Sequence, residues 1–186
     1  FVRRKHLIGY AHRWKVYIYF AALGFGFMFL ELAAIQQFAR FLPHPVYAFG
    51  VTVGIVLLFS GIGSRFSDRA VIRNFHVFAA IAIMMVLHVG LWQLSVRLRS
   101  MSWFYVDVLV VAGLSFFMGM PFPRGVERLR RGAPALVPWA WGINGFISVL
   151  AVLAAGLISL SAGLTALVLL AGVCYVIAAG PFPPET

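Results

Sequence analysis

Six long apolar runs, separated by short segments that hold most of the basic residues, dominate the sequence. A helix needs about 20 apolar residues to cross the roughly 30 Å hydrocarbon core of a bilayer. Charged residues make up 11% of the chain, against about 25% in soluble domains, so a soluble protein of this sequence could not cover its surface with polar groups. We therefore expect an all-α polytopic membrane protein with about six transmembrane helices. The runs place these helices at residues 16–41, 45–64, 75–96, 102–120, 138–160 and 164–179.

The division into domains follows from the same runs. We expect a basic cytoplasmic segment at 1–15, a six-helix transmembrane domain at 16–180 and a short cytoplasmic tail at 181–186. The only cysteine, Cys174, lies inside an apolar run, so neither a disulfide within the chain nor a cysteine-rich metal motif is expected. The first residue is phenylalanine, and we expect the sequence to be part of a longer product.

The basic residues are distributed unevenly between the two sides of the membrane. Of the 15 lysines and arginines, 12 fall on the side of the N-terminus, and only Arg40, Arg97 and Arg99 fall on the other. Because Lys and Arg accumulate in cytoplasmic loops, both termini should be cytoplasmic. The net charge of +10 does not indicate nucleic-acid binding, since the basic residues lie between apolar spans. We interpret those in the loops as a cytoplasmic surface that could hold anionic lipid headgroups or dock an acidic soluble domain. This surface consists of Arg65, Arg69, Arg73, Arg124, Arg128, Arg130 and Arg131.

Short stretches recur between the two halves of the chain. PVYAFGVTVG at 45–54 resembles PWAWGINGF at 138–146, and GFGFMFLE at 24–31 is loosely similar to GLSFFMGM at 113–120. Three helices followed by three of opposite orientation form the inverted repeat of many transporters. Matches this short among apolar residues also arise by chance. A 3+3 inverted repeat and chance similarity therefore stand as alternatives.

Three ionisable residues lie inside the predicted spans at similar depth. Counting 1.5 Å per residue places Glu31 roughly 22 Å and His88 roughly 20 Å from the cytoplasmic end, and Asp107 roughly 7 Å below the opposite surface. Intramembrane ionisable groups usually pair or face a cavity, and imidazole exchanges protons near neutral pH. A cluster of Glu31, His88 and Asp107 could therefore bind a cation or relay protons. The alternative is that a backbone group, an aromatic side chain or headgroup water satisfies each one separately.

Other polar and small residues indicate helix packing. Glu31 shares a helical stripe with Gly24 and should face protein, whereas Gln36 and Gln37 should meet headgroups or loop backbone near the outer interface. A buried Asn can join two helices, and glycines allow helix backbones to approach closely. We assign this packing role to Asn144, Gly142, Gly145, Gly50 and Gly54.

The sequence lacks the local motifs of common enzymes. It contains no GxGxxG, P-loop or GxSxG motif, and no pair of carboxylates in a loop. His76 and His88 would lie on one helix about 18 Å apart, which does not suit haem ligation. We therefore expect no catalytic residues, no cofactor and no metal.

Three stretches resemble a known family. They are FMFLELAAIQQFARFLPHPVYAFGVTVGIVLLFSGIGSRFSD, GMPFPRGVERL and VPWAWGINGFISVLAVLAAGL. Together they resemble the multi-pass membrane part of bacterial spermidine-synthase-like proteins, in which a membrane region is joined to an aminopropyltransferase- or methyltransferase-like domain. The resemblance implies a bacterial inner-membrane location. The glycine-rich loop and acidic residues of the transferase domain are absent from this sequence, so the resemblance does not make the chain an enzyme.

We therefore expect a non-catalytic integral membrane module that acts as an anchor, scaffold or accessory subunit of a larger membrane assembly. Its expected partners are anionic lipids at the cytoplasmic face and other membrane subunits. The alternative is a transporter of a small cation or polyamine that uses Glu31, His88 and Asp107. An enzyme acting on a lipid-soluble substrate has no supporting group of residues.

Overall fold

The computed structural model of the protein describes residues 10–67, 73–98 and 102–180, and this part of the chain is helical throughout apart from short connections. The elements, in chain order, are α2 (Tyr10–Phe38), α3 (Pro45–Arg65), α4 (Asn74–Leu98), α5 (Ser102–Met118), α6 (Pro121–Gly132), the 3₁₀ turn η1 (Pro134–Leu136), α7 (Val137–Ser161) and α8 (Gly163–Ala179). No strand occurs within these residues. Five of the helical stretches are long and apolar enough to cross a membrane, and α8 is a shorter apolar helix of 17 residues. The predicted class, an all-α polytopic membrane protein, is confirmed.

The helix boundaries agree with the predicted spans except at the two ends of the first helix. α2 begins at Tyr10 and ends at Phe38, so it includes the last residues of the segment 1–15. Residues 1–9 and 181–186 lie outside the described part of the chain. The predicted membrane domain, which starts at residue 16, therefore begins inside α2, after the basic residues Arg13 and Lys15 of the same helix.

Helix α6 corrects the prediction that a loop follows the fourth span. α5 ends at Met118, and a new helix begins at Pro121. Proline suits the first helical turn because its missing N–H would have no partner there. Pro121, Gly125 and Leu129 recur every four residues and are buried, while Arg130 and Arg131 are exposed. The PFPRG motif therefore starts an amphipathic helix rather than only stopping a span.

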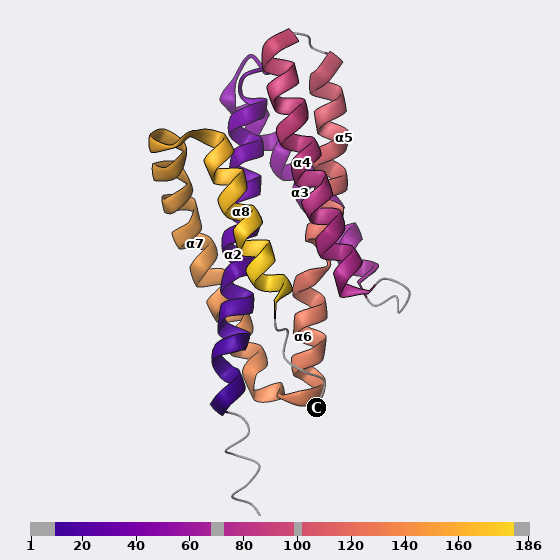
Figure 1. Ribbon diagram of the computed structural model, residues 1–186, viewed down its shortest axis with the longest axis vertical. Helices are drawn as coiled ribbons and strands as arrows, with labels where there is room; N and C mark the ends of the chain where they lie inside the picture. The colour runs from indigo at the N-terminus through magenta and orange to yellow at the C-terminus, as the bar shows by residue number, and fades with distance from the viewer. Residues whose placement is uncertain (1–9, 68–72, 99–101, 181–186) are drawn as a thin grey trace, which may run out of the picture.

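The helices form two groups of three, each built around one central helix. α2 packs along α7 and α8, and α5 packs along α3 and α4; contacts of α2 with α3 and of α4 with α8 join the groups (Figure 1). The first helix of each half of the chain thus packs on the last two helices of the other half. This reciprocal pairing has the symmetry that a 3+3 inverted repeat requires. Below, the end of the bundle that holds α6 is called the α6 end, and the opposite end is called the Arg40 end.

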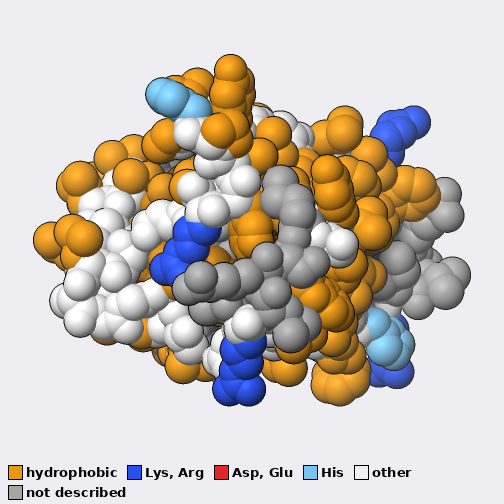
Figure 2. Space-filling model, turned by 90° about the horizontal axis from the view of Figure 1, so that it is seen from above, with side chains coloured by type: hydrophobic (Ala, Val, Ile, Leu, Met, Phe, Trp, Pro, Cys, Tyr) orange, Lys and Arg blue, Asp and Glu red, His pale blue; other side chains and the backbone are white. Residues whose placement is uncertain are grey.

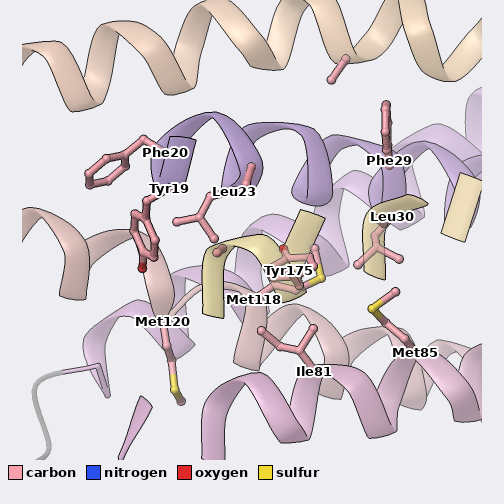
Figure 3. Packing of buried hydrophobic residues seen from close by; sticks show 14 of the residues in the cluster. Tyr19, Phe20, Leu23, Phe29, Leu30, Ile81, Met85, Met118, Met120 and Tyr175 are labelled. Carbon is pink, nitrogen blue, oxygen red and sulfur yellow. The ribbon is translucent and has the colours of Figure 1, made fainter. Parts of the chain in front are cut away.

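The larger hydrophobic core surrounds α2 and the partners on which it packs. Figure 3 shows buried side chains of α2, α4 and α8 gathering there, among them Phe20, Ile81 and Tyr175. The hydroxyl of Tyr19 donates a 2.7 Å hydrogen bond to the carbonyl oxygen of Pro121 and ties α2 to the start of α6. A second core joins α2, α3 and α5. Large apolar side chains cover the outside of α7, including Leu160, as expected for a surface that faces lipid.

Glycine allows close helix contacts, but not at the positions predicted. A Cβ on Gly63 would overlap the carbonyl oxygen of Phe116, and a Cβ on Gly119 would overlap that of Ser60, so α3 and α5 touch backbone to backbone. On the other side of the bundle, a Cβ on Gly24 would lie 3.0 Å from a backbone oxygen of α7.

The structure corrects the packing role assigned to four other glycines. A methyl group added at any of them would meet no atom of another described element within 4 Å, because each lies on an exposed helix face. They are Gly50, Gly54, Gly142 and Gly145. Spacing alone shows that two glycines share a face, and it does not show which face meets a neighbour.

Candidate functional site

Three buried polar side chains from three helices meet near the Arg40 end. Asp107 of α5 lies 2.8 Å from His88 of α4, between Oδ1 and Nδ1, and its Oδ2 accepts a hydrogen bond from the Nε2 of Gln37 of α2. All three side chains are 3% exposed or less. Each carboxylate oxygen therefore has its own donor, and the cluster connects the α2 group to the α5 group of helices.

The chemistry of this cluster follows from the donors and the acceptor. Nδ1 of His88 faces Oδ1 of Asp107, and its Nε2 lies on the other side of the ring. An ionised carboxylate only accepts hydrogen bonds, so with Asp107 in that form the Nδ1–H of His88 is the donor. Burial of a charged group is tolerated in a membrane protein when partners surround it. The Asp107 carboxylate is thus held by two donors from neighbouring helices, and its first role is to join them.

Glu31 lies apart from these three residues. It is buried, at 8% exposure, but no hydrogen bond or ion pair links it to another residue in the described ranges. It lies six residues before Gln37 on α2, which is about 9 Å deeper along the helix. The structure therefore brings together two of the three residues of the predicted cluster, His88 and Asp107, and adds Gln37 in place of Glu31.

The two glutamines also differ from their predicted role at the headgroups. Gln37 is buried against Asp107, and Gln36 donates a 3.2 Å hydrogen bond to the hydroxyl of Ser159 on α7. The amide of Gln37 lies against Asp107 of α5 and, with His88 of α4, lines a small gap, so it points into protein instead of the interface. A glutamine about one turn before the predicted end of a span at Phe41 was the available sequence signal.

Thr52 is a further buried polar group. Its side chain is fully buried on the face of α3 that also carries Ala48 and Val56, and no atom in the described structure accepts or donates a hydrogen bond at Oγ1. Ala48 and Val56, on the same face of α3, belong to the second core, where α3 meets α2 and α5.

A polar cavity opens beside the cluster at the Arg40 end. It has a volume of about 370 Å³ and is lined by Arg40, Trp92, Gln93, Arg97, Leu164 and Thr165. The guanidinium carbon of Arg40 lies 4.3 Å from the centre of the Trp92 ring, a cation–π contact. A much smaller gap of about 10 Å³ lies beside Gln37 and His88 and shares Trp92 and Thr165 with the larger cavity. The gap has about the room of one water molecule.

Asn144 joins α7 to α2. Its side-chain amide donates a 3.0 Å hydrogen bond to the carbonyl oxygen of Phe20, beside the close approach at Gly24. The residue thus has the geometry of the packing role predicted for it, without Gly142 and Gly145.

The basic residues predicted for the cytoplasmic surface fall into two kinds at the α6 end. Arg124 donates hydrogen bonds to the carbonyl of Ser67 and the side chain of Asn74, at 2.8 and 3.0 Å, and so fixes α6 to the chain before and after the α3–α4 connection. This position is structural rather than an open contact for lipid.

The other basic residues at this end are more accessible. Arg130 and Arg131 are exposed and pair with Glu127 at 3.2 and 2.9 Å. Arg65 and Arg73 are exposed, and Arg128 is partly exposed. Arg69 lies outside the described residues.

The fold and the buried cluster define a class: a multi-pass helical membrane protein whose polar residues bridge two groups of helices. Comparisons with family models, with curated proteins and with solved structures gave no match. No group of three His, Cys, Asp or Glu side chains that could hold a metal ion occurs within residues 10–67, 73–98 and 102–180.

Proposed function

We propose that the protein is a non-catalytic integral membrane module, an anchor or accessory subunit of a larger membrane assembly. The observation that carries the proposal is the use of the buried polar groups. Gln37, His88 and Asp107 satisfy one another and link three helices. Hydrogen bonds between helices are a means of holding a membrane bundle together.

The outer surface supports a role in assembly. The apolar surface of α7 continues over several turns through Phe146, Val149, Leu153, Leu157 and Leu160, all of them exposed. Such a surface suits lipid or the helices of another subunit. The resemblance to membrane regions that are joined to a transferase domain supports the same role.

The location that we propose is a bacterial inner membrane, with the α6 end on the cytoplasmic side. Exposed arginines at that end suit anionic headgroups, each contributing about 1 kcal/mol near an anionic surface.

Labelling of single cysteines tests this orientation. A cysteine at Gly132 should react with an impermeant reagent only after the cells are opened, and one at His44 should react in intact cells. The opposite result contradicts the orientation.

The module function is tested by extraction of the assembly under mild conditions, followed by native and denaturing mass spectrometry. We expect the chain to be held in fixed stoichiometry with larger subunits. The purified chain in vesicles should give no flux of Na⁺, K⁺ or spermidine above that of empty vesicles. A chain that is recovered alone and conducts one of these cations contradicts the proposal.

Cation or polyamine transport is the second candidate, and the isolated Glu31 favours it. A buried carboxylate with no hydrogen-bond partner among the described residues is costly in a membrane, and a bound cation would compensate it. Arg40 and Arg97 at the polar cavity oppose entry of a cation from that end. Under this candidate, Glu31→Gln abolishes the flux and Glu127→Gln, at the surface of α6, leaves it unchanged. Equal flux in wild type and Glu31→Gln removes the candidate.

A further inference from the structure

An apolar groove runs along the seam between α4 and α8. It has a volume of about 350 Å³, and its walls are built from side chains such as Ile81, Met85 and Val89 on α4 and Val168 and Val176 on α8. The seam is one of the places where the two groups of helices meet. From Phe78 to Val89 the groove is about 16 Å long. This is close to half of the roughly 30 Å hydrocarbon core, the depth that one leaflet supplies.

The groove leads toward the polar cavity at the Arg40 end. Val89 and Val168 line both the groove and the small gap beside His88, and Trp92 and Thr165 line both that gap and the polar cavity. The apolar groove and the polar cavity therefore lie one after the other along the same two helices, with only the small gap beside His88 between them. This is the layout of a site for an amphiphile, with the chain in one part and the headgroup in the other.

The charge of the polar cavity decides which headgroup fits. Arg40 and Arg97 are among the described residues that line it, and none of these described lining residues is acidic. Of the acidic residues that the structure describes, Glu31 and Asp107 are buried, and Glu127 lies at the other end. Figure 2 looks onto the Arg40 end and shows arginine or lysine side chains and no acidic side chain among the described residues. Only three of the 15 basic residues of the chain belong to this side, so two in one cavity indicate a purpose other than orientation.

We infer that the α4–α8 seam is a binding site for an anionic phospholipid. The phosphate contacts Arg40 and Arg97, while one acyl chain lies in the groove from Val89 to Phe78. The ring of Trp92, already beneath the guanidinium of Arg40, lies between the two parts of the site. The inference does not depend on whether the protein is a module or a transporter.

Native mass spectrometry of the protein in detergent, titrated with phosphatidylglycerol or with phosphatidylcholine of the same acyl chains, tests the site. We expect one phosphatidylglycerol to bind in preference to phosphatidylcholine. The double variant Arg40→Gln/Arg97→Gln should bind phosphatidylglycerol about 30-fold more weakly. The matched control, Arg130→Gln/Arg131→Gln, removes the same charge from the open surface at the α6 end. It should weaken only additional, low-affinity binding of phosphatidylglycerol and leave the first bound phosphatidylglycerol, and its preference over phosphatidylcholine, unchanged. Equal losses in the two double variants overturn the inference, because net charge would then explain the binding.

The contribution of the groove is tested separately. Ala82→Phe and Gly172→Leu place bulk into it, and an atom added at Gly172 lies 3.2 Å from the flexible end of Met85. The helical content measured by circular dichroism shows whether each variant folds. The two positions are changed in separate variants, so the test remains possible if one of them does not fold. We expect either folded variant to weaken phosphatidylglycerol binding at least tenfold. Unchanged binding in a folded variant, or glycerol phosphate binding as tightly as the lipid, shows that the groove is not used and overturns the inference.

Discussion

Replacing Asp107 by alanine removes the one acceptor that two donors on neighbouring helices share. Gln37 and His88 would then face an apolar side chain, and both are nearly inaccessible to water. The replacement leaves the sequence of α5 otherwise unchanged and does not touch the glycine contacts with α3. A loss of stability therefore reports on two links, the Gln37–Asp107 bond between the two groups of helices and the His88–Asp107 bond within the α5 group.

The expected magnitude follows from the number of bonds lost. Hydrogen bonds between transmembrane helices contribute on average about 0.6 and at most about 1.7 kcal/mol in double-mutant cycles. Two such bonds give an expected loss of about 1 to 3 kcal/mol in the free energy of unfolding. Asp107→Asn should cost less than half as much. Its side-chain oxygen can still accept from His88, and the amide of Gln37 can turn its oxygen toward the new NH₂ group.

The assay is unfolding of the purified protein in mild detergent micelles by increasing mole fractions of a denaturing detergent. Tryptophan fluorescence and circular dichroism follow the transition. A cycle with His88→Ala and Asp107→Ala should give a coupling energy of about 0.6 to 1.7 kcal/mol. If Asp107→Ala unfolds within about 0.3 kcal/mol of the wild type, the additivity error of such measurements, the cluster does not hold the helices together. An equal cost of Asp107→Asn and Asp107→Ala would refute the hydrogen-bond argument in a different way.

Other replacements test the contacts along the rest of the bundle by the same unfolding assay. Gly63→Leu should destabilise the protein by more than about 2 kcal/mol, because its Cβ would overlap a carbonyl oxygen of α5. The control Gly54→Leu, on the open face of the same helix, should cost under about 0.5 kcal/mol. Similar costs for both would contradict the described α3–α5 contact. Asn144→Ala should cost about 0.6 to 1.7 kcal/mol through loss of its hydrogen bond to the Phe20 carbonyl, and an unchanged unfolding transition would show that this bond contributes nothing. Glu31→Gln should leave stability unchanged or raise it, since it replaces a buried carboxylate that lacks a partner in the described structure with a neutral group; a loss comparable to that of Asp107→Ala would show that Glu31 is held by an interaction.

The candidate site shows how far depth along a helix can be predicted. Counting residues placed His88 and Asp107 at matching depth, and they do meet. The same count included Glu31, which lies about 9 Å deeper than the partner of Asp107 on α2. The estimate failed for α2 because it took Val16 as level with the start of α4, whereas α2 extends beyond α4 toward the α6 end, so that its residues lie deeper than the count places them (Figure 1). An error of one or two turns in a helix end moves every residue by that amount relative to the neighbouring helices.

The α6 segment shows a second limit. Two prolines and a glycine in PFPRG were interpreted as the end of a span, which is correct for α5. The residues that follow repeat their buried positions every four residues, a pattern that a loop would not need. The amphipathic helix was therefore present in the pattern, but its apolar face is narrow and its dominant feature in the sequence is four arginines.

The sequence by itself determined the class of the protein and the approximate positions of its six apolar helices. In a membrane the backbone must form its hydrogen bonds within the segment, so apolar runs of this length can only become helices here, whatever their neighbours are. Tertiary structure alone decided which helix faces meet. Glycines and polar residues occur on many helix faces, and the packing decides which of them make contacts. Gly63 contacts α5 and Gly54 does not, and Gln37 rather than Glu31 binds Asp107. Packing also brings two arginines, more than 50 residues apart in the chain, to one cavity at the end of the α4–α8 seam. Apolar helices of nearly uniform hydropathy carry little sequence signal that distinguishes the side facing lipid from the side facing protein, because both sides are apolar.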